Sequence, residues 1–460
     1  MRAERFGNLE VPKRRFGGGF IEVNPRRGLS KGGPYASPAR IKEEATLVIP
    51  LIVKSSVYEE PQNFKEKAME FLDKLCEEFR KYFRMSVENA KEEPYEVLIT
   101  NPYKPAELQR LSAELRRIKN ELRDRYGDAL EQRAVVLIFA RQSLKYQKLS
   151  PYYVSKCVLG HEIASQVVTD VALSNFDMSL ANVSLGVFAK LGGIPWVLNN
   201  FLPVDVVVGV GKTIIKYREE GRGEVSQDYL GSVAIVGANG VISEVRAKVA
   251  STKEELASWI GSNVQRAVSE FVLSSGTEEV SLSIHYSGKK PSKDELDGLK
   301  EVIEDLKNKK IKVSYKVLHI TDDVNASLLC KGCNYYPASG LYYLLSDKEA
   351  YLTPLGALKL GSSGPYYSFT GIPRTLKVSL VDASEDNEGG ASRLTEGLRE
   401  VYYLTFMHIA GMQININEPI TTKYSRDVAR LVGSVVCVRK KLGVECSISL
   451  GDVYERPWFL

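Results

Sequence analysis

The sequence predicts an α/β protein with parallel sheets that are covered by helices. Apolar stretches of strand length alternate with amphipathic stretches of helix length along most of the chain, and this alternation is typical of parallel sheets. With 460 residues, of which 44% are hydrophobic, the chain can bury a large core and has the length of about two domains. We therefore expect two α/β domains in succession.

Residues 1–45 are set apart by their composition. They are rich in Gly, Pro and Arg and show little periodicity, which predicts an irregular arm. The basic side chains of this arm fit contacts with a nucleic-acid backbone as well as they fit a flexible basic tail.

Residues 46–200 predict the first domain. Its expected elements are, in order, a strand that starts near Ala45, a helix at 62–85, a strand at 95–100, a helix at 105–126 and a strand at 134–140. The alternating charges of the helix at 105–126 predict a solvated surface with internal ion pairs. In open parallel sheets, ligands bind at the carboxyl ends of the strands. The segment after the third strand is therefore where we expect a binding site.

A short helix that can hold an anion is predicted to follow this strand. Ser150 suits the N-cap and Pro151 the first helical position, so the free N–H groups of the first turn lie at the positive end of the helix dipole. Tyr152 and Lys156 are four residues apart and share one face of the helix. A phenol and an ammonium beside free N–H groups fit a terminal phosphate, because charge-assisted hydrogen bonds must replace its hydration.

A second helix is predicted at about 177–191, where a Gly-Gly pair ends it. Asn182, Gly186 and Lys190 form one stripe of this helix at four-residue steps. The pattern fits both a core helix with a solvated face and a ligand-binding stripe. Gln166 lies before it, in a short stretch of strand type.

Residues 201–460 predict a second domain that begins with antiparallel strands. The expected elements are a strand at 204–211, a hairpin at 230–249 with Asn239 and Gly240 at its turn, a helix at 252–273, a strand at 279–288, a helix at 293–308, a strand at 312–320, an antiparallel patch at 341–354 and 374–382, and helices at 392–412 and 423–441. This order of a hairpin followed by alternating strands and helices has no visible internal repeat.

Four of these residues carry a resemblance to a known family. Tyr152, Lys156, Gln166 and Lys190, the last followed at once by LGGIPW, resemble the guide-end pocket in the MID domain of Argonaute (PIWI family) proteins. The likeness is greatest to short archaeal and prokaryotic members, and it extends from about Gly33 to the terminal PWFL. In that family the four residues hold the 5′-phosphate of a guide strand.

The resemblance implies a Rossmann-like MID domain at 46–200, followed by an RNase H-like PIWI domain at 201–460. It implies a protein that anchors a small guide, RNA or DNA, and pairs it with complementary target nucleic acid. Asn182, Lys289 and Lys290 are expected to contact the guide backbone. For the two lysines, a solvated turn is the alternative interpretation.

The carboxylates that an active PIWI domain needs are missing from the positions where the resemblance places them. Active members cut their target with acidic side chains that hold two divalent metals. The matching residues here are Gly211, Ser287 and Arg426. We therefore expect no enzyme activity. A guide-directed nuclease that uses the nearby Asp205 and Asp427 is the alternative.

Two short motifs resemble a nucleotide-binding loop and a zinc site, but each lacks residues that such a site requires. The GVGKT motif that starts at Gly209 suggests a P-loop-like nucleotide hydrolase, although Val206 stands where the first glycine belongs. The CKGC motif at Cys330–Cys333 supplies two zinc ligands where a structural site needs four. The nucleotide hydrolase is kept as a second alternative function.

The apolar C-terminal residues PWFL predict a packed tail. In short Argonautes the terminal carboxylate binds a divalent cation that is shared with guide phosphates, so the resemblance implies Mg²⁺ or Mn²⁺ at Leu460. A Gln that helps to hold this metal in relatives is matched by Gly186. This difference predicts a metal that is held more weakly or through water.

Composition adds limits on location and partners. The net charge of +5 permits nucleic-acid binding without arguing for it, and the six scattered cysteines do not predict a disulfide framework. No run of about 18 apolar residues would span a membrane, and we expect a cytoplasmic protein. The resemblance to inactive short Argonautes implies a separate effector protein and a role in defence against plasmids or viruses. The candidate contact surfaces are residues 1–45 and the tyrosines Tyr335, Tyr336, Tyr342 and Tyr343.

Overall fold

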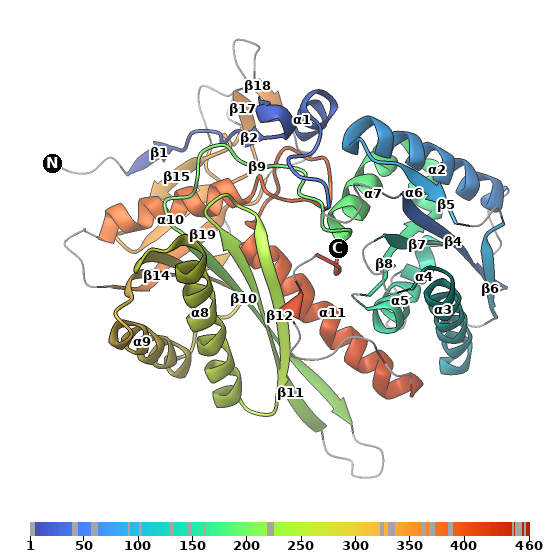
Figure 1. The fold of residues 1–460 in the computed structure, drawn as a ribbon. Coiled ribbons are helices and arrows are strands. Elements are labelled where there is room, and N and C mark those ends of the chain that lie inside the picture. The colour runs from blue at the N-terminus through green and yellow to red at the C-terminus, as the bar shows by residue number, and fades with distance from the viewer. Residues whose placement is uncertain are drawn as a thin grey trace.

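The structure of the protein is a computed structural model. It describes the chain except for residues 1–4, 39–44, 57–62, 91–92, 101–103, 128–132, 146–149, 161, 219–224, 323–325, 330–335, 360–364, 368–372, 385–389, 444–445, 447–452 and 455–456. Two α/β lobes lie side by side, and the C-terminus lies between them (Figure 1).

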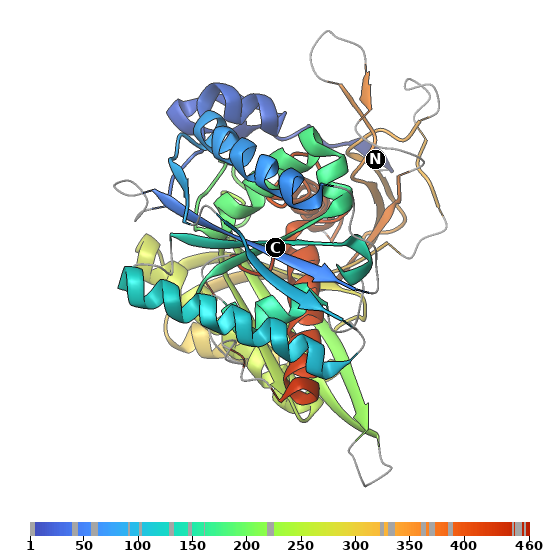
Figure 2. The ribbon, with the colours of Figure 1, turned by 90° about the vertical axis from the view of Figure 1, so that its right-hand side faces the viewer.

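The first lobe is built on a parallel sheet of five strands. It contains the strands β4 (Thr46–Ser55), β5 (Val87–Asn89), β6 (Tyr95–Ile99), β7 (Ala134–Ala140) and β8 (Ala164–Thr169), the helices α2 (Phe64–Glu78), α3 (Pro105–Tyr126), α4 (Gln142–Lys145), α5 (Pro151–Leu159), α6 (Asp170–Ser174) and α7 (Phe176–Lys190), and the π-helical turn η2 (Phe79–Phe83). The order is β5-β4-β7-β8, with β6 continuing the pairing of β4 beyond β5. Helices cover both faces of the sheet (Figure 2), which explains why β7 is buried along its whole length.

The second lobe is built on a mixed sheet of ten strands. It contains the strands β10 (Val206–Arg218), β11 (Val225–Gly237), β12 (Ile242–Ala250), β13 (Glu279–Ser287), β14 (Lys312–Thr321), β15 (Leu341–Leu344), β16 (Glu349–Thr353), β19 (Leu376–Ala383) and β20 (Val453–Tyr454), the two-stranded β17 (Ala357–Lys359) and β18 (Pro365–Tyr367), and the helices α8 (Lys253–Ser275), α9 (Lys293–Asn308), α10 (Gly390–Leu404) and α11 (Ile420–Leu442). The order is β1-β15-β16-β19-β14-β13-β10-β11-β12-β20. Strands β10, β13 and β14 are parallel, whereas β10, β11 and β12 are antiparallel.

The N-terminal segment is more regular than its composition predicts. It contains β1 (Phe6–Asn8), β2 (Arg14–Arg15), the 3₁₀ turn η1 (Gly17–Gly19), β3 (Ile21–Glu22) and α1 (Pro25–Gly32), and β2 pairs with β9 (Val197–Leu198). Arg14 is buried and donates hydrogen bonds to the carbonyls of Val23, Phe406 and Ile414. This side chain is therefore structural and does not contact solvent or a ligand.

Most expected elements are present with small shifts of their ends. The helix expected at 392–412 ends earlier, at Leu404, and the strand expected at 204–211 continues to Arg218 as β10. All five residues of GVGKT are paired with β11. A phosphate-binding loop at this motif is therefore excluded, because its backbone N–H groups belong to a strand. The CKGC motif lies outside the described residues.

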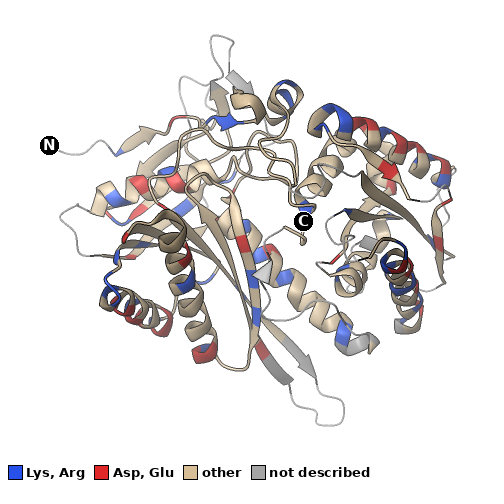
Figure 3. Ribbon diagram, viewed as in Figure 1, with Lys and Arg blue, Asp and Glu red and all other residues tan. Residues whose placement is uncertain are grey.

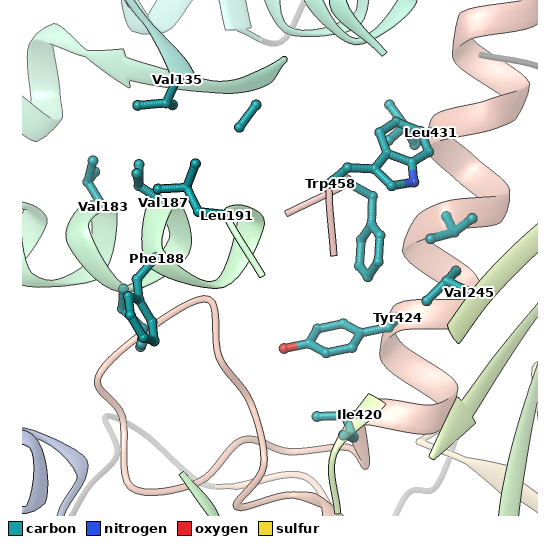
Figure 4. Close-up of a cluster of buried hydrophobic side chains, with 14 of the residues drawn as sticks. Val135, Val183, Val187, Phe188, Leu191, Val245, Ile420, Tyr424, Leu431 and Trp458 are labelled. Atoms are coloured by element: carbon teal, nitrogen blue, oxygen red, sulfur yellow. The ribbon is translucent and has the colours of Figure 1, made fainter. Parts of the chain in front are cut away.

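The junction between the lobes is filled by apolar side chains. Phe188 and Leu191 of the first lobe and Tyr424 and Leu431 of α11 belong to one core cluster with Trp458 of the tail, and Figure 4 shows them around the tail. Charged residues of both signs alternate on the outer helix α3 (Figure 3), where Arg117 forms ion pairs with Glu114 and Glu121. In the described part of the chain, no helix is long and apolar enough to cross a membrane.

Candidate functional site

The structure brings the four side chains of the expected pocket together. Tyr152 lies in the first turn of α5 and Lys156 in its last turn, while Gln166 lies on β8 and Lys190 ends α7. The Nζ atoms of Lys156 and Lys190 both donate to the carbonyl oxygen of Ser165, at 3.1 and 2.9 Å. Lys190 also donates to the Gln166 side chain. Two ammonium groups therefore converge on one point.

These two ammonium groups are unusual because they are buried without an opposite charge. Lys156 and Lys190 are 1% and 2% exposed, and among the described residues neither forms an ion pair with a carboxylate. Burial lowers the pKa of Lys156 to about 7. Burial and the neighbouring Lys156 lower the pKa of Lys190 well below its ordinary value. Because a buried charge is costly unless it is paired, this arrangement favours an anionic ligand.

The pocket lies at the opposite end of the sheet from the one we expected. Gln166 is near the start of β8, where it pairs with Leu137 in the middle of β7. Helices that follow parallel strands run back along the sheet, so the last turns of α5 and α7 reach the amino end of β8. Both lysines come from these last turns, which explains the location. The open N-terminus of α5 does not supply the main donors.

The C-terminal residues close one side of the pocket. Lys156 donates to the carbonyl of Trp458, and the Tyr152 hydroxyl donates to the carbonyl of Phe459 at 2.7 Å. Trp458 and Phe459 are buried against α11, where the Phe459 ring packs on Tyr424 at 5.4 Å. The predicted packing of the tail is therefore confirmed.

A disulfide joins the pocket helix to the chain after α11. Cys157, which follows Lys156, is bonded to Cys446 across a separation of 289 residues. The scattered cysteine positions did not predict this bond, because only the fold brings the two residues together.

A cavity of about 370 Å³ adjoins the pocket and is shared by both lobes. Its walls are formed by Tyr152, Tyr153, His408, Ala410, Lys423, Asp427, Arg430, Leu431, Phe459 and Leu460. Burial lowers the pKa of His408 to about 3, so its ring is neutral near pH 7. The volume of the cavity, and the charged groups of Lys423, Asp427 and Arg430 in its largely apolar wall, fit a nucleotide-sized part of a ligand that is anchored at the lysines.

The side chains present do not form a divalent-metal site by themselves. Asp427 is held by Lys423 at 2.9 Å, and the Gln166 oxygen accepts from Lys190. Gly186 adds no ligand, although a Cβ atom there would lie 3.7 Å from the Gln166 oxygen. Within the described ranges, no three His, Cys, Asp or Glu residues are grouped to share a metal. A metal beside Leu460 would therefore need further oxygen ligands, which guide phosphates or water would supply.

The residues expected along the guide backbone lie apart from the pocket. Asn182 accepts a hydrogen bond from the backbone N–H of Met412 at 2.8 Å, so its oxygen links α7 to the second lobe. Lys289 and Lys290 are exposed on the turn that follows β13. The lysine pair is therefore open to a ligand, whereas Asn182 has a structural contact.

The three positions of the expected nuclease site are adjacent and contain no carboxylate. Val210 pairs with Tyr286, so the next residues on these strands, Gly211 and Ser287, are neighbours. A Cβ atom on Gly211 would lie 2.8 Å from the backbone nitrogen of Arg426 on α11. The backbone of α11 thus fills the space that an acidic side chain at position 211 would need.

The two acidic residues considered as substitutes lie elsewhere. Asp205 accepts hydrogen bonds from the N–H and hydroxyl of Ser281, at 2.8 and 2.6 Å. It precedes β10, about 20 Å along the strand from Gly211 at the usual rise per residue. Asp427 faces the cavity beside Tyr152. Neither carboxylate therefore lies beside Gly211 and Ser287, where the expected nuclease site would be.

Comparison with known proteins identifies the fold. No protein-family model and no curated protein sequence matches the chain. The structure superimposes on the Argonaute of Aquifex aeolicus over 99% of the chain, with a TM-score of 0.62 at 18% identity. The chain has the Argonaute fold. Its mixed α/β architecture, with parallel sheet strands covered by helices, matches the MID-PIWI fold of Argonaute structures.

Two further Argonaute-fold structures show the same likeness. Aa-Ago with externally bound siRNA gives a TM-score of 0.65 at 20% identity, and Drosophila Piwi gives 0.65 at 14% identity, each over 99% of this chain. The chain spans 56% or 57% of the length of these three structures. Identities this low establish the Argonaute fold and leave the ligand to be argued from the site itself.

Several features of the site were not anticipated from the sequence. The carbonyl of Ser165 is shared by both ammonium groups, and the carbonyls of Trp458 and Phe459 close the pocket. Backbone acceptors have no signature in a sequence. The apolar tail was the one visible signal, and it indicated burial without indicating which side chains the tail contacts.

Proposed function

We propose that this protein holds the 5′-phosphate of a small guide strand in the pocket of Tyr152, Lys156, Gln166 and Lys190, and pairs the guide with a complementary target. The observation that carries the proposal is the pair of buried ammonium groups without a carboxylate partner. A terminal phosphate supplies the missing charge and accepts several hydrogen bonds at once. The Tyr152 hydroxyl and the Gln166 amide, which donate to the carbonyls of Phe459 and Val167, are additional donors near the lysines.

The adjoining cavity favours a nucleic-acid strand as the ligand over a free phosphate ion. Its wall contains Tyr152 of the pocket together with Lys423 and Arg430 of α11, which offer cationic groups to the phosphates that follow the first one. Lys289 and Lys290 are proposed to contact the backbone farther along. One of the similar structures contains siRNA, which agrees with a nucleic-acid ligand. Experiment must decide whether this chain binds RNA or DNA, because such a pocket recognises the phosphate and the backbone, which do not identify the type of strand.

We also propose that the protein binds its target without cutting it. Gly211, Ser287 and Arg426 occupy the corner where a two-metal nuclease needs carboxylates. The positions of Asp205 and Asp427 argue against relocated carboxylates. The strand conformation of GVGKT argues against a nucleotide hydrolase. The expected Mg²⁺ or Mn²⁺ stays a prediction, because the described side chains do not complete its coordination.

The finer assignment is a short-type Argonaute that acts in the cytoplasm through a separate effector in defence against plasmids or viruses. A binding protein without nuclease activity needs such a partner for target recognition to have a consequence. Of the candidate surfaces, β1 pairs with β15 and the Phe6 ring packs on Tyr343 at 4.5 Å, with Phe6 60% exposed. Tyr336 is also exposed, and Tyr335 lies outside the described residues.

The experiment that tests the proposed function is recovery of the bound nucleic acid. Protein purified from its own host should carry short strands whose 5′ ends are labelled by a kinase only after phosphatase treatment, and sequencing should identify them as RNA or DNA. Copurification of the effector should depend on a matching plasmid or virus. Protein that carries no short strands, or strands with 5′-hydroxyl ends, would contradict the proposal.

A further inference from the structure

The two lysines of the pocket share one acceptor, and neither forms an ion pair with a carboxylate of the described residues. Each Nζ lies about 3 Å from the same Ser165 oxygen, so the two nitrogens are within about 6 Å of each other. Both side chains are almost completely buried. Two like charges at this distance and depth repel each other, and both lose their hydration. The free pocket therefore disfavours two simultaneous positive charges.

The groups that surround the pair do not supply a compensating negative charge by direct contact. The hydrogen-bond acceptors of the two ammonium groups within the described ranges are the carbonyls of Ser165 and Trp458 and the Gln166 oxygen, and Lys156 Nζ also lies 5.6 Å from the centre of the Tyr152 ring. Tyr152 is neutral, because burial raises the pKa of its phenol. On α3, which packs against α5, Lys119 and Arg123 share Glu162. The titratable and charged groups of the adjoining cavity are Tyr153, His408, Lys423, Asp427, Arg430 and the carboxylate of Leu460.

We propose that the pocket takes up a proton when it binds a 5′-phosphate: one of the two lysines is neutral in the free protein and becomes charged in the complex. This inference rests on the proposed function of the site. The phosphate brings negative charge to within hydrogen-bond reach of both nitrogens, which removes the reason for either to stay neutral. The proton comes from the buffer. The lowered pKa of each lysine in the free protein agrees with this order of events.

The direction of the pH dependence follows from the sign of this proton uptake. The complex binds more protons than the free protein, so the affinity falls as the pH rises above about 7, where burial places the pKa of Lys156. Uptake of one proton weakens binding about tenfold for each pH unit. The 5′-phosphate itself changes its charge near pH 6, and His408 is already neutral. Measurements between about pH 7.5 and 9 therefore report on the lysines.

The test uses the whole chain and short single strands of one sequence, as RNA and as DNA, with either a 5′-phosphate or a 5′-hydroxyl. Calorimetric titrations at pH 8 in two buffers of different ionisation enthalpy count the protons taken up. We expect at least one proton for the phosphorylated strand and markedly fewer for the hydroxyl strand. The preference for the phosphorylated strand, as a ratio of dissociation constants, should fall about tenfold from pH 7.5 to 8.5.

Variants identify the lysines that take up the proton. Lys156→Met and Lys190→Met each leave one lysine in the pocket, so proton uptake should be smaller than in the unmodified protein. Lys307→Met, an exposed lysine of α9, should leave uptake unchanged. A constant phosphate preference from pH 7.5 to 9 with equal heats in both buffers would overturn the inference and leave the proposed function intact. Equal affinity for phosphate and hydroxyl strands at every pH would overturn both.

Discussion

Gly211 on β10 and Ser425 on α11 are in contact through their backbones: a Cβ atom on Gly211 would lie 2.5 Å from the carbonyl carbon of Ser425. The helix therefore rests directly on the strand at the corner where the resemblance places the first acidic residue of an active PIWI domain. The close approach of α11 leaves no space for an acidic side chain at position 211. Replacing the missing residues one by one should not rebuild a nuclease.

The first prediction concerns this corner. Gly211→Asp, alone or with Ser287→Asp, should lower the free energy of unfolding by about 1–3 kcal/mol, the usual cost of overpacking, and should not produce cleavage. Denaturant unfolding and a single-turnover assay with guide, matched target and Mg²⁺ or Mn²⁺ measure both effects. Gly298→Ala on α9, where a Cβ meets nothing within 4 Å, is the control and should be slightly stabilising. Target cleavage by the unmodified protein that Asp205→Ala or Asp427→Ala abolishes would show that the active site lies elsewhere.

The second prediction concerns the tail. Deleting Phe459 and Leu460, or adding residues after Leu460, should weaken guide binding and reduce its dependence on Mg²⁺ or Mn²⁺. The reason is that the Phe459 carbonyl holds the Tyr152 hydroxyl and Leu460 lines the adjoining cavity. Affinity measurements with and without chelator test this, with an N-terminally tagged protein as the control. Equal affinity and equal response to chelator in the extended protein would rule out a role of the tail.

The third prediction concerns the metal. Gly186→Gln should make guide binding more dependent on Mg²⁺ or Mn²⁺, because a Cβ atom at this position meets only the Gln166 oxygen, at 3.7 Å, and an amide oxygen adds a ligand. Gly186→Ala is the matched control, since it adds a Cβ atom without a ligand. Titration of each variant with metal at fixed guide concentration gives the comparison. If glutamine and alanine respond alike, no metal is bound next to this helix.

The fourth prediction concerns the N-terminal segment. Arg14→Met should lower the free energy of unfolding by more than about 2 kcal/mol, because three carbonyls lose a buried charged donor. Arg15→Met is the control, because its exposed side chain donates hydrogen bonds to Asn199 and its loss should cost less than about 0.5 kcal/mol. Comparable losses in thermal or chemical unfolding would show that the segment is not held by Arg14.

Regular elements with strong local signals were predictable from the sequence. The helix α3 was expected at its observed bounds because Pro105 starts it and apolar residues recur at helical spacing up to Tyr126. The hairpin of β11 and β12 was expected from Asn239 and Gly240 at its turn. Residue type and spacing, together with the resemblance, singled out the four side chains that the structure brings together.

Other features depend on contacts that are distant in the sequence. Arg14 was assigned to a basic arm, yet its donors reach carbonyls that lie almost 400 residues away. The end of the sheet at which Lys156 and Lys190 meet depends on helix direction and length. The pairing of GVGKT with β11 also required the partner strand, because a short motif alone does not distinguish a loop from a strand.

The central claim is that Lys156 and Lys190 hold a 5′-phosphate, and it is tested most directly by their effect on strands that differ only at that group. Lys156→Ala and Lys190→Ala should each weaken binding of a 5′-phosphorylated strand by about 1.5 to 3 kcal/mol, the range for hydrogen bonds to charged groups. Lys307→Ala should not change it. With a 5′-hydroxyl strand, all three variants should bind like the unmodified protein. Equal losses for both strands in Lys156→Ala and Lys190→Ala would contradict the assignment of the pocket.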